Sequence, residues 1–254
     1  MIPIKKGAEI DGMRRSSQVL GRILAELSAL VQPGLTTRDL DEAAAKMIRE
    51  AGGKSPFYGY RGFPGHICVS VSEEVVHGIP GKRKLLYGEI VKLDIGIVLN
   101  GWVSDTAASI PVGAVAPEIE ALLAQTQLAL VQGIGQARAG NRLGDISAAI
   151  ERCVVGAGYT VVREFVGHGV GRSLHEEPQI PNYGRSGSGP LLKAGMTLAI
   201  EPMVNLGQAE IRILQDGWTV VTVDGKPSSH FEHTVLVTDG EPEILTGGKS
   251  STLS

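Results

Sequence analysis

The stretch EIVKLDIGIVLNGWVSDTAASI, residues 89–110, decides the fold and supplies the first two candidate site residues. Asn100-Gly101 lies near its middle, and Asn-Gly between two runs rich in β-branched residues is the strongest short-range signal for a two-residue hairpin loop. Because side chains alternate along a strand, this loop places Asp94 and Asp105 on the same face of the hairpin. The two aspartates become diagonal neighbours, with Cα atoms roughly 7–8 Å apart.

Two carboxylates that converge on a face that should be apolar repel each other unless a cation lies between them. The hairpin therefore predicts a metal site at Asp94 and Asp105. The alternative is an ordinary hairpin whose aspartates lie on a solvated face, since acids are common on protein surfaces. Features elsewhere in the chain favour the metal site.

The chain contains an internal repeat. Residues 33–53 align with residues 139–159 at an offset of 106 positions, and glycine, aspartate and alanine residues coincide along the two segments. A repeat of this kind predicts two similar structural units that pack against each other. We therefore expect two similar halves, about 7–112 and 113–247, within a single catalytic domain that covers residues 1–254.

Further motifs follow the same order in both halves. HGIP, which begins at His77, corresponds to HEEP, which begins at His175. The strand ends that carry the two aspartates then correspond to those that carry Glu201, in AIEP, and Glu232, in FEHT. A pseudo-twofold arrangement of the halves would bring all four acids to one centre.

The composition is typical of a compact enzyme. At 254 residues and 43% hydrophobic, the chain can bury one substantial core or two fused half-domains. The net charge of −3 and the pI near 6.1 argue against nucleic acid as a partner. No apolar signal segment and no run of transmembrane length is present, so no membrane partner is expected. Two cysteines give no disulfide framework, which suits a cytoplasmic location.

Helical and extended patterns occur in blocks along the chain, which predicts an α/β (α+β) fold. Hydrophobic periodicity and capping signals predict helices over residues 7–31, 37–52, 117–138 and 143–156. Strands are expected over residues 66–76, 90–99, 102–112, 159–166, 196–204, 209–223 and 231–238. The Gly/Ser-rich residues 184–189 predict an exposed loop.

Charge and ligand type indicate which metals such a centre would hold. Four carboxylates carry a charge of −4, which two divalent ions would neutralise. Oxygen ligands with one imidazole, His168 in VGHGVG, favour Mn²⁺, Co²⁺, Fe²⁺ or Zn²⁺, whereas a closed structural zinc site more often uses cysteine. Two ions about 3.5–4 Å apart can share a bridging water and polarise a carbonyl, which suits hydrolysis of amide or phosphoester bonds. The glycines around His168 lack the spacing of a dinucleotide-binding loop.

The chain resembles the type I methionine aminopeptidases, the short bacterial kind, in the motifs HGIPG, VKLDIG, DTAAS, GHGVGRSLHEEPQI, AIEPM and FEHTVLVT. The resemblance extends from the first helix to about residue 247. It implies the pita-bread fold, in which two pseudo-symmetric halves of antiparallel sheet and helices surround a dinuclear metal site. It also implies the metal ligands Asp94, Asp105, His168, Glu201 and Glu232.

The resemblance implies roles in catalysis as well. His77 matches a residue that hydrogen-bonds the scissile amide region, and His175 matches one that stabilises the tetrahedral oxyanion. Glu201, besides being a ligand, matches the general base that takes a proton from the bridging water. His233 is expected to point to the opposite face as a structural residue, and His66 receives no role.

A pocket for a methionine side chain is also implied. Apolar walls with sulfur–aromatic contacts suit a thioether. The positions that match the family's pocket are Phe57, Tyr60, Phe63, Cys68 and Trp218. The chain departs from the family at Leu174, where an aromatic residue is often found, and at His230, where glutamine is common. We expect Leu174 to loosen the pocket and His230 to affect the surroundings of Glu232 or the approach of the substrate.

The resemblance implies an enzyme that removes the initiator methionine from nascent polypeptides whose second residue is small. A metal-bridging hydroxide would attack the first peptide bond, with two divalent ions (Co, Mn, Fe or Zn) as cofactors. A monomer that meets nascent N-termini at the ribosome is expected. One alternative is a prolidase-like or aminopeptidase P-like hydrolase on the same fold, which usually carries a large extra N-terminal domain. Another is a non-catalytic binding homologue, which should show broken ligands.

Overall fold

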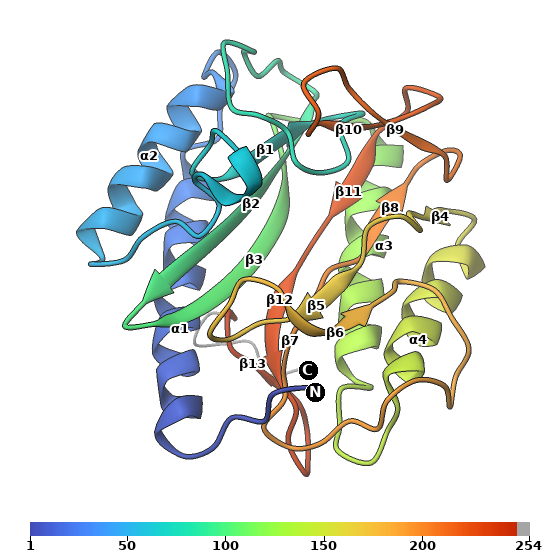
Figure 1. Ribbon diagram of the computed structural model, residues 1–254. Coiled ribbons are helices and arrows are strands. Elements are labelled where there is room, and N and C mark those ends of the chain that lie inside the picture. The colour runs from blue at the N-terminus through green and yellow to red at the C-terminus, as the bar shows by residue number, and fades with distance from the viewer. Residues whose placement is uncertain (248–254) are drawn as a thin grey trace.

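The computed structural model describes residues 1–247 and confirms the mixed α/β class. Strands occupy the centre, with a pair of helices on either side (Figure 1). Helices α1 (Ala8–Ala29) and α2 (Thr37–Glu50) flank the first half of the chain, and α3 (Pro117–Ile134) and α4 (Leu143–Gly156) flank the second. Among the described residues, no helix is both long enough and apolar enough to cross a membrane.

The first half contains a three-stranded antiparallel sheet in the order β1-β2-β3. Its strands are β1 (Cys68–Val71), β2 (Ile90–Leu99) and β3 (Trp102–Pro111). The two-residue loop between β2 and β3 has φ angles of 51° and 77°, the positive values that a type I′ turn requires. Asp94 lies opposite Ala107, and Asp105 lies opposite Gly96. The hairpin predicted from the sequence is confirmed, with both aspartates on one face.

The second half contains a five-stranded antiparallel sheet in the order β13-β12-β7-β5-β6. Its strands are β5 (Gly167–Gly169), β6 (Glu176–Ile180), β7 (Thr197–Ile200), β12 (His233–Leu236) and β13 (Glu243–Ile244). Two smaller sheets have the orders β11-β8-β4 and β10-β9. Their strands are β4 (Thr160–Val161), β8 (Met203–Asn205), β9 (Ile211–Ile213), β10 (Val220–Thr222) and β11 (Ser228–His230).

Helices α2 and α4 begin and end at positions separated by the 106 residues of the sequence repeat. In each helix the third residue is an aspartate that accepts the backbone N–H of the residue before the helix. Asp39 accepts from Thr36 at 2.7 Å, and Asp145 accepts from Arg142 at 2.8 Å. The carboxylate satisfies an N–H and also lies favourably near the positive end of the helix dipole. The repeated aspartates thus mark equivalent helix starts.

Each half has its own apolar core. In the first half, Leu93, Ile95 and Ile97 of β2 pack in one cluster with Leu20 and Leu27 of α1. The core of the second half joins α3, α4 and the strands, and includes Leu130, Ile146, Ile150, Leu198 and Val204. Burial of each such side chain contributes about 1.5–3 kcal/mol. These cores fix the helices to the outer faces of the sheets.

The two halves meet where β3 runs beside the segment that leads into β12. Ala107 and Glu232 exchange backbone hydrogen bonds there, at 3.4 and 2.9 Å. The Thr234 hydroxyl accepts the Asp105 N–H at 3.1 Å and donates to the Asp105 carbonyl at 2.7 Å. This junction brings Asp105 and Glu232, one from each half, onto neighbouring strands.

Two strand predictions missed a break in the backbone. The strand expected over 66–76 pairs only from Cys68 to Val71, because Ser72 has a φ of 48° that is incompatible with an extended strand. The strand expected over 196–204 is interrupted after Ile200, since Pro202 has no N–H to donate to the ladder. The break leaves Glu201 outside the regular strand.

Three other strand predictions were too long. Residues 209–223 form two strands, β9 and β10, because Asp216-Gly217 makes a turn with a positive φ of 77° at the glycine. The strand expected over 159–166 shrinks to β4, since its partner β8 is only 3 residues long. The strand expected over 231–238 begins two residues later, as β12.

Candidate metal centre and substrate cavity

One cavity of about 360 Å³ contains all the residues that the sequence analysis assigned to the site. Those expected to bind metal or take part in catalysis are Asp94, Asp105, His168, Glu201, Glu232, His77 and His175. Those expected to hold a methionine side chain are Phe57, Tyr60, Phe63, Cys68, Leu174 and Trp218. The fold therefore gathers both sets, which are scattered along the chain, around one space.

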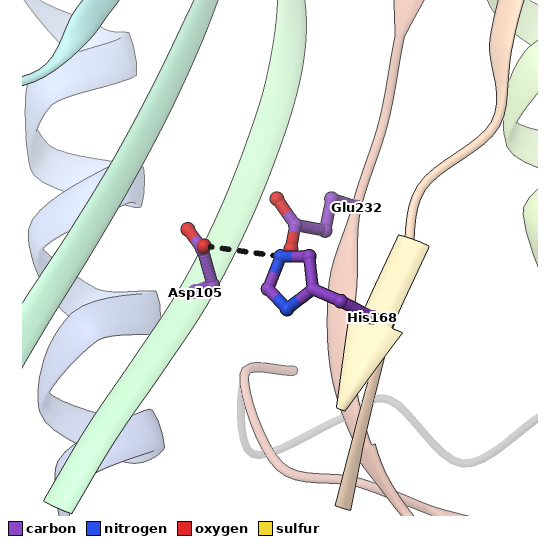
Figure 2. Close-up of side chains that lie close together, drawn as sticks. All are labelled: Asp105, His168 and Glu232. Carbon is purple, nitrogen blue, oxygen red and sulfur yellow. Dashed lines mark ion pairs between the residues drawn. The ribbon is translucent and has the colours of Figure 1, made fainter. Parts of the chain in front are cut away.

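Asp105, His168 and Glu232 form a compact cluster of potential metal ligands (Figure 2). Their ligand atoms all lie within 4.8 Å of one another, and all three side chains are buried. His168 Nε2 is 3.8 Å from Asp105 Oδ2. The other ring nitrogen, Nδ1, lies 2.9 Å from the Gly169 carbonyl oxygen. That contact holds the ring so that Nε2 faces the acids, as is usual for a metal-binding histidine.

Asp94 and Glu201 extend this cluster. Asp94 lies on β2 opposite Cys68, on the face of the hairpin that also carries Asp105. Glu201 directly follows β7, and its Oε1 lies 3.6 Å from His168 Nε2. The four acids and the imidazole therefore come from β2, β3, β5, the end of β7 and the segment before β12.

Two of the acids, Asp105 and Glu232, are buried without the partners that buried charges need. Asp105 Oδ1 and Glu232 Oε1 have no hydrogen-bond partner among the described residues. Burial raises the pKa of Asp94 to about 7 and the pKa of Glu201 to about 8. Burial and then the neighbouring carboxylates raise the pKa of Asp105 and of Glu232 well above their usual ranges. A divalent cation among these oxygens would favour the ionised forms, so the residues fit divalent metal ions.

His77 lies on the loop between β1 and β2 with a positive φ of 59°. Such a conformation is costly for a residue other than glycine and persists only where the surroundings hold it. Its ring packs edge-on against Phe165 and Trp218, with centroid distances of 5.1 and 6.2 Å. Burial lowers the pKa of His77 to about 4, so the ring is neutral near pH 7. A neutral ring can donate one hydrogen bond and accept another.

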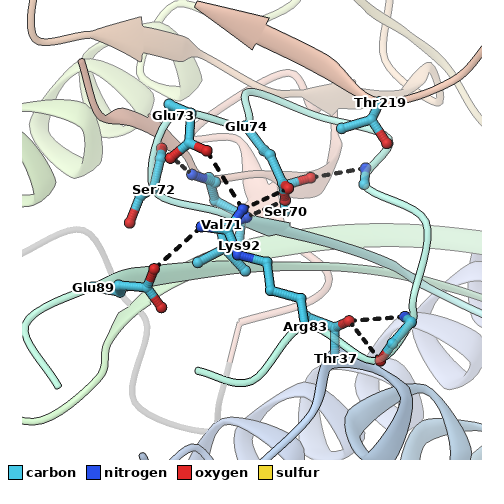
Figure 3. Close-up of polar contacts among 12 residues, drawn as sticks. Thr37, Ser70, Val71, Ser72, Glu73, Glu74, Arg83, Glu89, Lys92 and Thr219 are labelled. Atoms are coloured by element: carbon cyan, nitrogen blue, oxygen red, sulfur yellow. Dashed lines mark hydrogen bonds and ion pairs between the residues drawn. The ribbon is translucent and has the colours of Figure 1, made fainter. Parts of the chain in front are cut away.

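A partly buried polar network holds the loop between β1 and β2 (Figure 3). Lys92 Nζ donates to the Ser72 carbonyl at 2.7 Å and to the Ser228 carbonyl at 2.9 Å. Arg83 pairs with Glu74 of the same loop at 2.7 Å. Because Lys92 is only 1% exposed, water does not compete for its bonds. Lys92 thus ties strand β2 and the loop to β11 of the second half.

His175 lies directly before β6, beside His168, with ring centroids 4.4 Å apart. The Tyr60 hydroxyl, at the start of the 3₁₀ helix η1 (Tyr60–Gly62), is 2.9 Å from His175 Nδ1. Burial and then the nearby Arg61 guanidinium lower the pKa of His175, which favours the neutral ring. His175 therefore stands at the metal cluster with one nitrogen already in contact with a hydroxyl.

An apolar wall lies beside the acids in the same cavity. Phe57, Phe63, Cys68 and Leu174 are buried in one cluster, and Trp218 packs against it. Phe63 and Trp218 meet edge to face with ring centroids 5.1 Å apart. This wall can receive an apolar side chain of a ligand whose polar groups face the acids.

Several residues that line the cavity were not predicted from the sequence. They are Arg61, Glu164, Phe165, Val166 and Gln179. Proximity to the motifs could have indicated them. Arg61 lies within FYGYRGF, and Phe165-Val166 directly precede the GHG of β5. Gln179 lies opposite His168 in the β5–β6 pair, which no sequence signal predicted.

The remaining histidines occupy different surroundings. His66 is not among the cavity residues and stacks on Tyr58, with ring centroids 4.5 Å apart and an interplanar angle of 10°. His233 Nδ1 is 2.9 Å from the Thr246 hydroxyl, a structural contact away from the cavity. His230 is buried with its Nε2 3.6 Å from Glu201 Oε2.

Comparisons with known proteins agree with this geometry. Residues 11–239 match metallopeptidase family M24. The chain is 48% identical over 246 residues to the methionine aminopeptidase of Clostridium perfringens, covering 97% of this chain and 99% of that one. The structure matches the crystal structure of the methionine aminopeptidase from Rickettsia prowazekii with a TM-score of 0.96 and 38% identity, covering 97% and 100% of the two chains.

A more distant structure shares the architecture. The prolidase from Pyrococcus furiosus matches with a TM-score of 0.80 at 20% identity, covering 97% of this chain and 66% of that one. At that identity the likeness concerns the fold alone, and it confirms the pita-bread fold that the motifs implied. The family match and the similarity over nearly the full length establish the family: this chain belongs to the methionine aminopeptidases of metallopeptidase family M24.

Proposed function

We propose that this protein removes the N-terminal methionine from polypeptides by metal-dependent hydrolysis of the first peptide bond in the cavity described above. One observation carries the proposal: two buried and two half-buried carboxylates, an imidazole and an apolar wall line the same cavity. The carboxylates provide a hydrolytic metal centre, and the wall receives an apolar side chain next to it. Membership of the methionine aminopeptidases supports the same function.

The metal ions would be held by Asp94, Asp105, His168, Glu201 and Glu232. The unpaired oxygens and the raised pKa values of the buried acids support this assignment. We propose two divalent ions, because four carboxylates would otherwise leave a net charge in a buried site, and Co, Mn, Fe or Zn suit this donor set. Bound ions of this kind activate water and polarise a carbonyl group.

Glu201 is the proposed acceptor of the proton that the attacking water releases. It lines the cavity, and its Oε1 lies 3.6 Å from His168 Nε2, at the cluster of candidate ligands. A carboxylate in this position can take a proton and later return it to the departing amine. The interruption of β7 at Pro202 supports the role, because it allows the Glu201 side chain to turn into the cavity.

His175 is the proposed stabiliser of the negative charge that develops on the carbonyl oxygen. We assign the hydroxyl of Tyr60, 2.9 Å from Nδ1, as the donor to the neutral ring. The ring proton then resides on Nε2, which becomes the donor that an oxyanion needs. His77, a neutral ring that also lines the cavity, is proposed to hydrogen-bond the scissile amide.

The methionine side chain is proposed to lie against Phe57, Phe63, Cys68, Leu174 and Trp218. Aromatic edges and a thiol are suitable neighbours for a thioether, which fills irregular apolar space well. The preference for a small second residue also belongs to this proposal. Its natural substrates would then be nascent polypeptide N-termini, met at the ribosome in the cytoplasm, and the enzyme would act as a monomer.

We further propose that the two halves form one catalytic domain. Asp94 and Asp105 come from the first half, and His168, Glu201 and Glu232 from the second, so neither half holds the site alone. The backbone bonds between β3 and the start of β12 support this reading. Residues 248–254 of the expected domain lie outside the described residues.

Hydrolysis of short peptides by metal-reconstituted enzyme tests the proposal. Met-Ala should be cleaved fastest and Met-Leu more slowly, while Ala-Pro should resist. Loss of turnover after exhaustive chelation, with recovery on adding a divalent ion, would establish the metal dependence. Cleavage confined to the Ala-Pro bond would instead indicate a prolidase-like enzyme, and metal binding without any turnover would indicate a binding protein.

A further inference from the structure

His230 is a buried polar group that the proposed function leaves unexplained. The side chain is 1% exposed, and neither ring nitrogen has a hydrogen-bond partner among the described residues. Leaving one buried polar atom unpaired costs about 1–3 kcal/mol, so a buried imidazole in this state requires a physical reason. An apolar residue of similar size would fill the same space without that cost.

The position of His230 relative to Glu201 provides the reason. His230 Nε2 lies 3.6 Å from Glu201 Oε2, while His168 Nε2 lies 3.6 Å from Glu201 Oε1. The Glu201 carboxylate therefore lies between two imidazoles, one at each oxygen. His168 and Glu201 line the cavity, whereas His230 is not among the lining residues. His230 can thus influence the reaction only through cavity residues next to it, and Glu201 is the one whose carboxylate oxygen faces the His230 ring.

The backbones of both residues are anchored. The Ser109 hydroxyl accepts the His230 N–H at 2.9 Å and donates to the His230 carbonyl at 2.8 Å. On the other side of β11, His230 pairs with Met203, two residues after Glu201. The Glu201 carbonyl accepts the Asn182 side-chain amide at 2.9 Å. A hydrogen bond between the two side chains therefore needs only a small rotation that closes the gap by under about 1 Å.

We propose that His230 is a positioning residue that donates a hydrogen bond from Nε2 to Oε2 of Glu201. A carboxylate oxygen offers only lone pairs, so the nitrogen that faces it must carry hydrogen. With Oε2 held in this way, Oε1 stays turned towards His168 and the metal site. Carboxylates that ligate metals are commonly fixed by such outer partners, whose removal costs about 10–100-fold in metal affinity or activity. The inference rests on the proposed role of Glu201 as ligand and proton acceptor.

Two substitutions separate the hydrogen bond from the packing. His230→Leu fills similar space without a donor, and His230→Gln keeps a side-chain N–H that can reach the same oxygen. We expect His230→Leu to weaken Co²⁺ binding, followed by visible absorption, and to lower kcat, each by about 10–100-fold, with a smaller change in KM. His230→Gln should keep the Co²⁺ affinity and kcat within about threefold of those of the unaltered enzyme. If His230→Gln loses as much as His230→Leu, donation to Glu201 is not the function of this residue.

Two further variants make the outcome decisive. His233→Leu, which removes a half-buried histidine of the same segment, controls for general loss of packing and should leave the Co²⁺ spectrum and kcat unchanged. In a Glu201→Ala background, His230→Leu should have no additional effect on Co²⁺ affinity, because the partner is already absent. An additive loss there would overturn the inference. If Glu201→Ala itself left Co²⁺ binding and turnover intact, the proposed role of Glu201 would fail instead.

Discussion

The two halves of the molecule supply their share of the candidate site in different ways. In the first half, one hairpin carries both acids, and Asp94 and Asp105 lie within a few residues of its turn. In the second half, His168 lies on β5, Glu201 directly follows β7 and Glu232 directly precedes β12, three different strands of one sheet. The first half therefore depends on local pairing, whereas the second depends on the assembly of the whole sheet.

The contrast extends to the regularity of the strands. Strands β2 and β3 pair over their whole length of 10 residues without interruption. The second half has shorter strands, a register shift between His168 and Gly169, and the break at Pro202. Both irregularities lie at or next to a candidate ligand. Irregular backbone thus occurs where side chains must turn into the cavity, as is common beside functional sites.

The largest effect should follow removal of one acid from either half. Asp105→Ala and Glu232→Ala should each weaken divalent-metal binding by about 10²–10³-fold, because removing one partner of a buried charge cluster costs about 3–5 kcal/mol. Metal content after dialysis and isothermal titration measure this. Equal losses would show that the halves share the metals. If only one variant lost metal, the centre would belong to a single half.

Replacement of His175 should lower turnover without removing metal. His175→Ala is expected to lower kcat by about 10²–10³-fold, as loss of one oxyanion donor does, while metal content stays near that of the unaltered enzyme. Steady-state kinetics and metal analysis on the same preparation check both parts. Parallel loss of metal and activity would make His175 a structural partner of His168 instead.

The stability of the metal-free protein should fall as the pH rises from 6.5 to 8.5. The pKa values of Asp94, about 7, and Glu201, about 8, are raised above those of the unfolded chain, so folding is favoured where these groups stay protonated. That stability is lost as the pH passes through the folded-state pKa values, with a change on the order of 2 kcal/mol.

Urea unfolding across this pH range, with chelator and with metal, measures the effect. Below pH 6.5 the buried histidines have the opposite effect, so that stability falls as the pH is lowered. Burial lowers the pKa of His168 and His230 to about 4, and their protonation therefore favours the unfolded chain. Bound metal should remove most of the dependence above pH 6.5. If the free energy of unfolding of the metal-free protein did not change with pH in this range, the pKa values of these acids would not be raised in the folded state.

The connection between the halves can be weakened at Lys92. Lys92→Met keeps most of the buried volume but leaves the Ser72 and Ser228 carbonyls without their donor, so the free energy of unfolding should fall by about 2 kcal/mol. The matched control is Lys46→Met at an exposed lysine, which should change stability by less than about 0.5 kcal/mol. Equal effects of the two substitutions would mean that Lys92 does not join the halves.

The smallest effect concerns the apolar wall. Leu174→Phe should raise the ratio of methionine to norleucine turnover a few-fold, because a phenyl ring confines an unbranched side chain more tightly than leucine does. Discrimination in an apolar pocket amounts to about 1–3 kcal/mol per methylene, so near-isosteres should be hydrolysed measurably by the unaltered enzyme. An unchanged ratio in the variant would show that Leu174 does not contact the substrate side chain.

Local sequence signals were sufficient for the regular parts of this protein. The Asn-Gly loop fixed the pairing of Asp94 with Ala107 and of Asp105 with Gly96, because a two-residue turn permits one register. Helix α4 begins and ends at the predicted residues, 143–156, since its aspartate and apolar spacing act within a few turns of chain. The repeated motifs also related the four acids and the pair His77 and His175, all of which line the cavity, though they did not show how close these residues lie.

Tertiary structure decided the irregular parts and the contacts between distant segments. The contact of Tyr60 with His175, the pairing of Gln179 with His168 and the burial of His230 behind Glu201 join residues that no local pattern relates. Their positions depend on how whole sheets pack, and packing sums many long-range contacts that a sequence window does not contain. The sequence determined which side chains are available for a metal centre, and only the packing of the two halves determined which of their atoms face one another.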